Sequence, residues 1–171
     1  GNHDIGNAVM AKTYRQRYGE PYYHFVYRDA LFLCLCTEDP PATQVSPEQI
    51  DHVRRALEAN KDVRWTFVLM HKPLYEPQAP GAGPHPAWTQ IEALLGDRPY
   101  TVFAGHKHVY EKWVKDGRKH VRLSVTGGTT GPRGLKHKAF DHFLWVTMTP
   151  DGPRIAVVLL EGVQDDDLAL P

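Results

Sequence analysis

Apolar and polar positions follow two different patterns along the chain. Up to about residue 104, short apolar runs of strand length stand between stretches with helical periodicity, and beyond that point only strand patterns remain. Helices are expected at 7–18, 47–59 and 88–95, and strands at 22–28, 30–37, 65–70, 100–104, 109–115, 121–126, 143–149 and 155–160. This order predicts an α+β fold, a sandwich of mixed and then antiparallel strands with helices outside the sheets.

Cap and turn residues support these boundaries. Asn7 precedes the first helix and Gly19 follows it, while Ser46-Pro47-Glu48-Gln49 is typical of a helix start. Asp116-Gly117 and Asp151-Gly152 predict tight hairpins between neighbouring strands. The acidic stretch 165–167 is expected to be a solvated end. Without repeats or a linker, residues 1–171 are interpreted as one domain.

Composition narrows the function classes. Twenty basic and twenty acidic side chains cancel, which argues against a nucleic-acid-binding surface. No apolar run approaches the ~18 residues of a membrane span, so no membrane partner is expected. Cys34 and Cys36 are expected to be buried thiols, since a disulfide between them would distort a strand. Oligomeric state and compartment are left open.

Three polar clusters stand where strands give way to loops. They are Asn2-His3-Asp4, then His71 after the run 65–70, and the pair His106 and His108 after the run 100–104. Loops at strand ends gather ligands because a buried strand fixes their position. Imidazole nitrogens and amide oxygens suit divalent metals such as Zn, Mn and Fe. An extended His-x-His segment would project both rings to one side, so it could serve two adjacent metals. Taken alone, each histidine could equally be structural.

These residues resemble a known family. Gly1-Asn2-His3-Asp4, His71 at a strand end and Gly105-His106-Lys107-His108 are similar to the last three of the five motifs of the calcineurin-like metallophosphoesterases. The resemblance covers residues 1 to about 130. It implies a phosphate-ester substrate, either a monoester or a diester, and two divalent or trivalent metal ions (Mn, Fe or Zn).

The resemblance also implies residue roles. Asn2, His71 and His106 would bind one metal, and His108 would bind the other. His3 would stand beside the leaving group, oriented by Asp4, and would donate a proton to it. In the family, a hydroxide held between two metals ~3.5–4 Å apart attacks phosphorus.

The sequence departs from the family at one point. The first two motifs, Asp-x-His and Gly-Asp-x-x-Asp, carry the anionic metal ligands, and they do not occur in these 171 residues. The chain is therefore expected to be the C-terminal part of a metallophosphoesterase domain, with weak metal binding and negligible turnover by itself. The alternative is a degenerate, non-catalytic scaffold or binding domain that retains the fold.

Other polar residues are weaker candidates. His24, His52 and His120 have no neighbour at metal-ligand spacing and are interpreted as structural. Arg133, in the glycine-rich stretch 127–134, could contact a phosphate, and a simple turn is the other interpretation. His85 is a further weak candidate for the substrate pocket.

Overall fold

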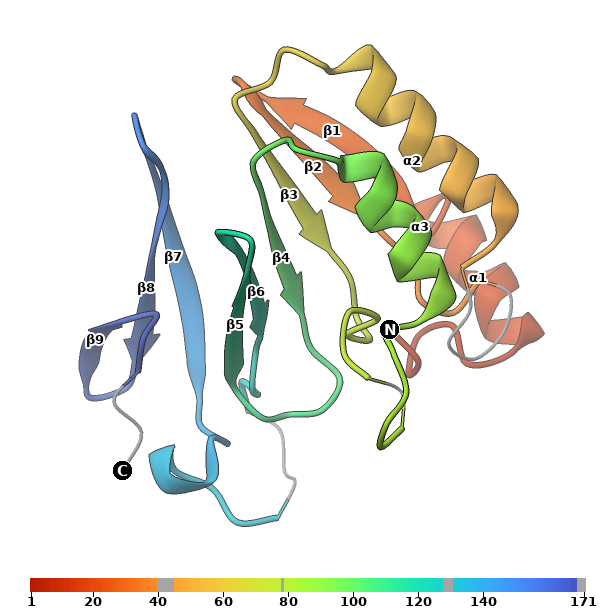
Figure 1. Cartoon of the computed structure of the whole chain (residues 1–171). Coiled ribbons are helices and arrows are strands. Elements are labelled where there is room, and N and C mark those ends of the chain that lie inside the picture. Colours follow the sequence, from red (N-terminus) through yellow and green to blue (C-terminus); the bar gives the residue numbers. More distant parts are fainter. Residues whose placement is uncertain (40–44, 78, 128–130, 169–171) are drawn as a thin grey trace. The chain divides into compact units, whose positions relative to one another are not determined.

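The computed structural model describes residues 1–39, 45–77, 79–127 and 131–168. It forms two compact units, Gly1–His106 and Lys107–Pro171, which are described separately (Figure 1). None of the helices in the described ranges is both long and apolar enough to span a bilayer.

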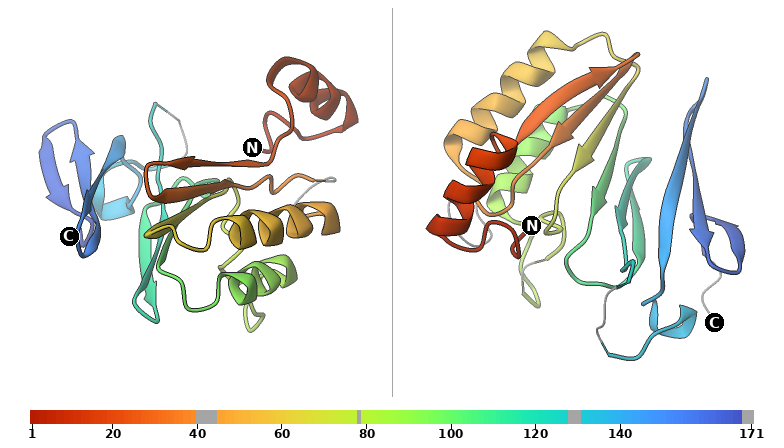
Figure 2. Two further views of the ribbon diagram at one scale, coloured as in Figure 1. Left: turned by 90° about the horizontal axis from the view of Figure 1, so that it is seen from above. Right: turned by 180° about the vertical axis from the view of Figure 1, so that it is seen from behind.

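The first unit is built on four strands. They are β1 (Tyr23–Tyr27), β2 (Ala30–Cys34), β3 (Trp65–Leu69) and β4 (Tyr100–Ala104). β2, β3 and β4 are parallel neighbours, whereas β1 forms an antiparallel hairpin with β2. Helices α2 (Pro47–Ala59) and α3 (Pro86–Leu95) cover one face of this sheet (Figure 2). Helix α1 (Ala8–Tyr18) has no buried residue.

Register determines which side chains meet the helices. Leu33 stands opposite Val68, which stands opposite Val102, and all three are almost completely buried. This row packs with α2 and α3 residues such as Val53 and Ile91 to form the core. The other face carries a stack of aromatic rings from successive strands, Phe25, Phe32, Phe67 and Phe103.

Helix caps follow the sequence signals. Asn7 accepts a hydrogen bond from the Met10 N–H, and Ser46 accepts one from the Gln49 N–H. Gln49 is completely buried, and its amide group bonds both the N–H and the carbonyl of Cys36. These bonds hold the chain just beyond β2 against α2, which positions the loop that follows.

In residues 107–127 and 131–168, the second unit consists of strands and a short 3₁₀ turn, η1 (Leu135–His137). β5 (Glu111–Lys115) and β6 (Arg118–Arg122) form a hairpin, and β7 (His142–Thr149), β8 (Gly152–Leu159) and β9 (Gly162–Asp165) form an antiparallel sheet. Asp116 and Gly117 both have positive φ, as the tight hairpin turn requires.

The prediction of mixed strands with helices, followed by antiparallel strands, is confirmed. Several boundaries were wrong: the strand expected at 121–126 lies at Arg118–Arg122, and β9 was not predicted. The turn explains why the strand expected at 121–126 begins earlier. A two-residue hairpin loop at Asp116-Gly117 lets strand pairing resume directly at Arg118. Cys36 is buried and Cys34 partly so, and both thiols are free.

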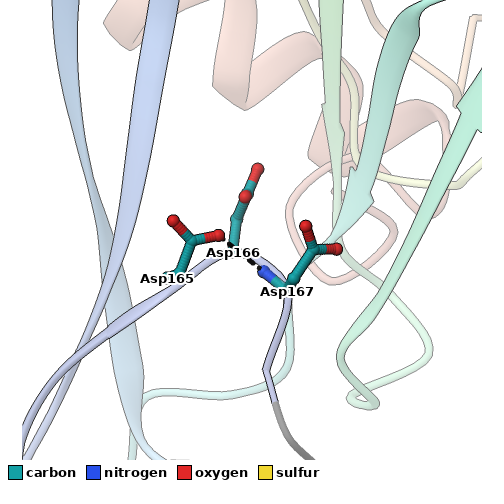
Figure 3. A group of neighbouring side chains, drawn as sticks. All are labelled: Asp165, Asp166 and Asp167. Atoms are coloured by element: carbon teal, nitrogen blue, oxygen red, sulfur yellow. Dashed lines mark hydrogen bonds between the residues drawn. The ribbon is translucent and has the colours of Figure 1, made fainter.

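The expectation of a solvated end at 165–167 is wrong for Asp166, which is 3% exposed. Its carboxylate pairs with Lys112 and with Lys119, and its carbonyl accepts a hydrogen bond from the buried Tyr110 hydroxyl. Figure 3 shows Asp165, Asp166 and Asp167 side by side, with the Asp167 N–H donating to Asp165. Because Asp167 also pairs with Lys112, this acidic group ties the chain after β9 to the β5–β6 hairpin.

His142 makes the stability of the second unit depend on pH. Burial lowers the pKa of this imidazole below its ordinary value of 6.5. Its Nδ1 donates to the Phe140 carbonyl at 3.2 Å, and its Nε2 has no hydrogen-bond partner among the described residues. Below pH 6.5 the unfolded chain gains a proton that the folded chain resists, so stability falls as pH falls.

We expect His142→Asn, which keeps a donor near Nδ1, to flatten this dependence. Between pH 7 and 5 the wild-type chain should lose up to about 1.4 kcal/mol more per pH unit than the variant. Urea denaturation at several pH values measures this difference. Parallel profiles for the two proteins would show that His142 titrates normally.

Candidate metal centre

The loops after the three parallel strands meet at one edge of the first unit. Strand-type pairing continues past the strand ends, from the Met70 N–H to the Phe103 carbonyl and from the Gly105 N–H to the His71 carbonyl. The carboxyl edge of a parallel sheet is where α/β proteins bind ligands. The strand register therefore brings His71 and His106 to the same edge.

The N-terminal segment 1–5 lies against this edge. Ile5 is buried and its N–H bonds the Gly1 carbonyl, which closes a turn around Asn2. Gly1 faces the His71 ring so closely that a Cβ atom would stand 2.8 Å from its Cγ. A side chain at position 1 would therefore force the His71 ring to move, which glycine avoids.

Three donor atoms come together as a result. His71 Nε2 lies 2.7 Å from Asn2 Oδ1 and 3.2 Å from His106 Nδ1. We call these three residues the Asn2–His71–His106 cluster. Ligands of one metal ion at 2.0–2.2 Å stand about 3 Å apart, so this spacing fits a single cation. The donor types fit a borderline metal such as zinc.

The protonation state also fits. Burial, together with the charges of the N-terminal ammonium group and of His106, lowers the pKa of His71 to about 4. At neutral pH this imidazole is therefore uncharged and keeps a lone pair for a metal. Because the Asn2 Oδ1 atom can only accept, the His71 Nε2 atom donates to it when no cation is bound.

The cluster offers no negative charge. Among the described residues of the first unit, no carboxylate or cysteine sulfur lies within 4.8 Å of the ligand atoms of both His71 and His106. A dication held by these three residues would keep its full charge, because none of the three carries a negative charge.

The backbone at the histidine pair differs from the expectation. The His-x-His segment was predicted to be extended, and this is wrong: His106 has φ of 72° and His108 has φ of 57°. A left-handed conformation costs a non-glycine residue about 1 kcal/mol. His106 ends the first unit, whereas His108 belongs to the second, where its carbonyl accepts a hydrogen bond from Ser124.

His3 and Asp4 are both exposed. The Asp4 carboxylate accepts a hydrogen bond from the N-terminal ammonium group at 2.9 Å, and this bond lowers its pKa. No hydrogen bond joins Asp4 to His3 in the described part of the chain, so the orienting role of Asp4 stays a prediction.

The weaker candidates have structural contacts. Arg133 pairs with Asp141 at 2.6 Å, which is the structural use of this guanidinium. Gly128, Thr129 and Thr130 of the glycine-rich stretch lie outside the described residues. His85 caps α3 by accepting from the Ala87 N–H.

Sequence reasoning missed a buried ion pair beside the cluster. Glu38 follows β2 and Lys72 follows His71, and their side chains meet at 2.7 Å with exposures of 2% and 12%. The Lys72 N–H also bonds the Thr37 hydroxyl. Together these contacts join the loops after β2 and β3 on either side of His71. Each residue lies just beyond an apolar strand run, and this position was the sequence signal that could have identified the pair.

We expect Lys72→Met to destabilise the chain by about 3 kcal/mol, because it leaves the Glu38 carboxylate buried without its partner. Combining it with Glu38→Gln should recover most of that loss. Denaturant unfolding of both single variants and the double variant measures the coupling. Lys12→Met, at an exposed lysine, is the control. Additive losses in the double variant would contradict the pairing.

Comparisons with known proteins agree with this architecture. The sequence matches the calcineurin-like phosphoesterase family over residues 1–110. Solved structures with a similar fold include a purple acid phosphatase, PPD1, from yellow lupin seeds (TM-score 0.60, 15% identity, 97% of this chain and 37% of that one). A dimetal phosphatase from Danio rerio has a TM-score of 0.55 and 12% identity, covering 95% of this chain and 62% of that one.

A third similar structure is GAP50, described as the anchor in the inner membrane complex of Plasmodium. Its TM-score is 0.58 at 16% identity, over 84% of this chain and 52% of that one. The chain thus spans between about a third and two thirds of the length of these three proteins. No curated protein matches the sequence.

Proposed function

This chain belongs to the calcineurin-like phosphoesterase family, and from that premise we propose that it supplies part of a two-metal centre that hydrolyses a phosphate monoester or diester. The observation that supports this most directly is the Asn2–His71–His106 cluster, in which three loops present neutral donors at the spacing of ligands around one ion.

The residues divide between two metal positions in this proposal. Asn2, His71 and His106 hold one ion, and His108 contributes to the second. Two bound metal ions would supply the positive charge that stabilises the attacking and leaving oxygens on phosphorus. The missing anionic ligands come from protein outside these 171 residues, since the described first unit offers no carboxylate to the cluster.

His3 is assigned the proton transfer. It is exposed and directly follows Asn2, so its imidazole can reach a substrate bound at the edge of the cluster. An imidazolium can donate a proton to a leaving oxygen near neutral pH. Asp4, next in the chain, would influence the charge and orientation of His3.

A second candidate is a non-catalytic scaffold that keeps the fold. The donor set of the cluster favours it, because no described carboxylate of the first unit stands beside both histidines to supply the negative charge of the two missing motifs. The fold likeness to an anchor protein of Plasmodium is compatible with such a role. Under this alternative the full-length gene product contains neither of the two missing motifs and has no phosphoesterase activity.

In the full-length gene product, we expect His71→Ala and His106→Ala each to remove one metal equivalent. Hydrolysis of p-nitrophenyl phosphate should fall by more than a hundredfold, since loss of a ligand exceeds the roughly 10–100-fold effect of losing an outer-shell partner. Metal analysis and steady-state kinetics measure both quantities. His137→Ala, at an exposed histidine, is the control. Full activity in the ligand variants would exclude the assignment.

His3→Ala should separate chemistry from metal binding. We expect unchanged metal content and a fall in kcat of at least about a hundredfold for substrates with poor leaving groups. The fall should be smaller for p-nitrophenyl phosphate, whose leaving group needs little protonation. Kinetics with a series of phenyl phosphates measure this dependence. An equal loss for every leaving group would argue against a proton donor at position 3.

A further inference from the structure

Two histidines outside the cluster meet although 28 positions separate them. His24 lies on β1 opposite Leu33 of β2, so it points to the sheet face that α2 covers. His52 lies on α2. The Nδ1 atom of His24 is 3.1 Å from the Nε2 atom of His52, and the ring centroids are 5.0 Å apart.

The surroundings of this pair leave it open to solutes. His24 is exposed and His52 is partly exposed. The pKa of His52 is lowered by its partial burial and by the proximity of His24, so it is uncharged at neutral pH. Glu48 stands four residues before His52, which places both on one stripe of α2. The Tyr22 ring meets His52 edge-on at 5.4 Å.

We propose that His24, His52 and Glu48 form a second metal site, which binds one borderline divalent cation such as Zn²⁺ or Ni²⁺. Two imidazole nitrogens around a tetrahedral ion, each at 2.0–2.1 Å, stand about 3.3 Å apart. The observed 3.1 Å therefore requires a small ring rotation and no backbone movement. The Glu48 carboxylate does not lie within 4.8 Å of the ligand atoms of both histidines, so its side chain must rotate toward the ion, where it adds the negative charge that the Asn2–His71–His106 cluster lacks.

Proton positions change without a net change in charge on the two rings. In the hydrogen-bonded pair, one of the two facing nitrogens carries a proton. When the cation binds, each imidazole holds its proton on the far nitrogen, His24 on Nε2 and His52 on Nδ1, and both facing lone pairs become ligands. Neutral imidazole is the ligand form, so acidification to pH 5 releases the cation.

Binding would join two elements of the first unit. β1 pairs with β2 alone among the described strands, and its five residues are all exposed. A metal that bridges His24 and His52 ties this edge strand to α2. Because the folded chain then binds the cation more tightly than the unfolded chain does, Zn²⁺ raises the melting temperature.

The test uses Zn²⁺ alone and the 171-residue chain with His71→Ala and His106→Ala, which removes two donors of the cluster. Competition with a chromophoric chelator at pH 7.5 should detect one remaining equivalent. Adding His24→Ala or His52→Gln should weaken it at least tenfold, and Glu48→Gln should weaken it severalfold. Adding His137→Ala, at an exposed histidine of the second unit, should change nothing.

Nuclear magnetic resonance locates the ion independently. Substoichiometric Ni²⁺ should broaden backbone signals of residues 22–25 and 48–52 before all others. Metal-free melting curves show whether each variant is folded. Unchanged Zn²⁺ affinity in a folded His24→Ala/His52→Gln variant, or in Glu48→Gln, would overturn the three-ligand site. This outcome is distinguishable from failure of the phosphoesterase proposal, which concerns His71 and His106.

Discussion

The burial of one row of apolar side chains on β2, β3 and β4 determines where the candidate chemistry stands. Leu33, Val68 and Val102 face α2 and α3 in direct register, and a slip of one residue would expose all of them. The same register brings the residues after β3 and β4 to one edge. His71 and His106 are therefore neighbours because a hydrophobic core, rather than their own interaction, requires it.

Charge is the second constraint on this edge. The charge of Glu38 acts on the imidazole of His71, and Lys72 pairs with the Glu38 carboxylate. The carboxylate is therefore committed to joining two loops and is not available as a metal ligand. At one edge of the sheet, a buried ion pair joins the loops, and the neutral donors of the Asn2–His71–His106 cluster stand beside it. The family membership of the chain and the incomplete donor set are thus consistent with each other.

Sequence patterns predicted the features that depend on residues close together in the chain. The caps at Asn7 and Ser46 and the hairpin at Asp116-Gly117 were found because each signal lies within a few residues of its effect. Contacts between distant residues were not found. The sequence predicted a solvated end at Asp166, whereas the structure pairs this residue with Lys112 and Lys119. The sequence also indicated no partner for His24, which contacts His52 because β1 packs beside α2. The left-handed backbone of His106 has no sequence signal, since glycine is the usual residue there.

The two imidazole pairs of the first unit illustrate how packing sets the character of a site. His71 is partly buried, Gly1 closes against its ring, and His106 is held in a conformation that costs free energy, so the geometry exists before any ligand arrives. His24 and His52 are more exposed, and Glu48 is on an open helix surface. In these two proposals the first pair would gain affinity from preorganisation but lacks charge, whereas the second would have to order its side chains, Glu48 included, on binding. Similar donors in one unit would therefore have different requirements for binding the same ion.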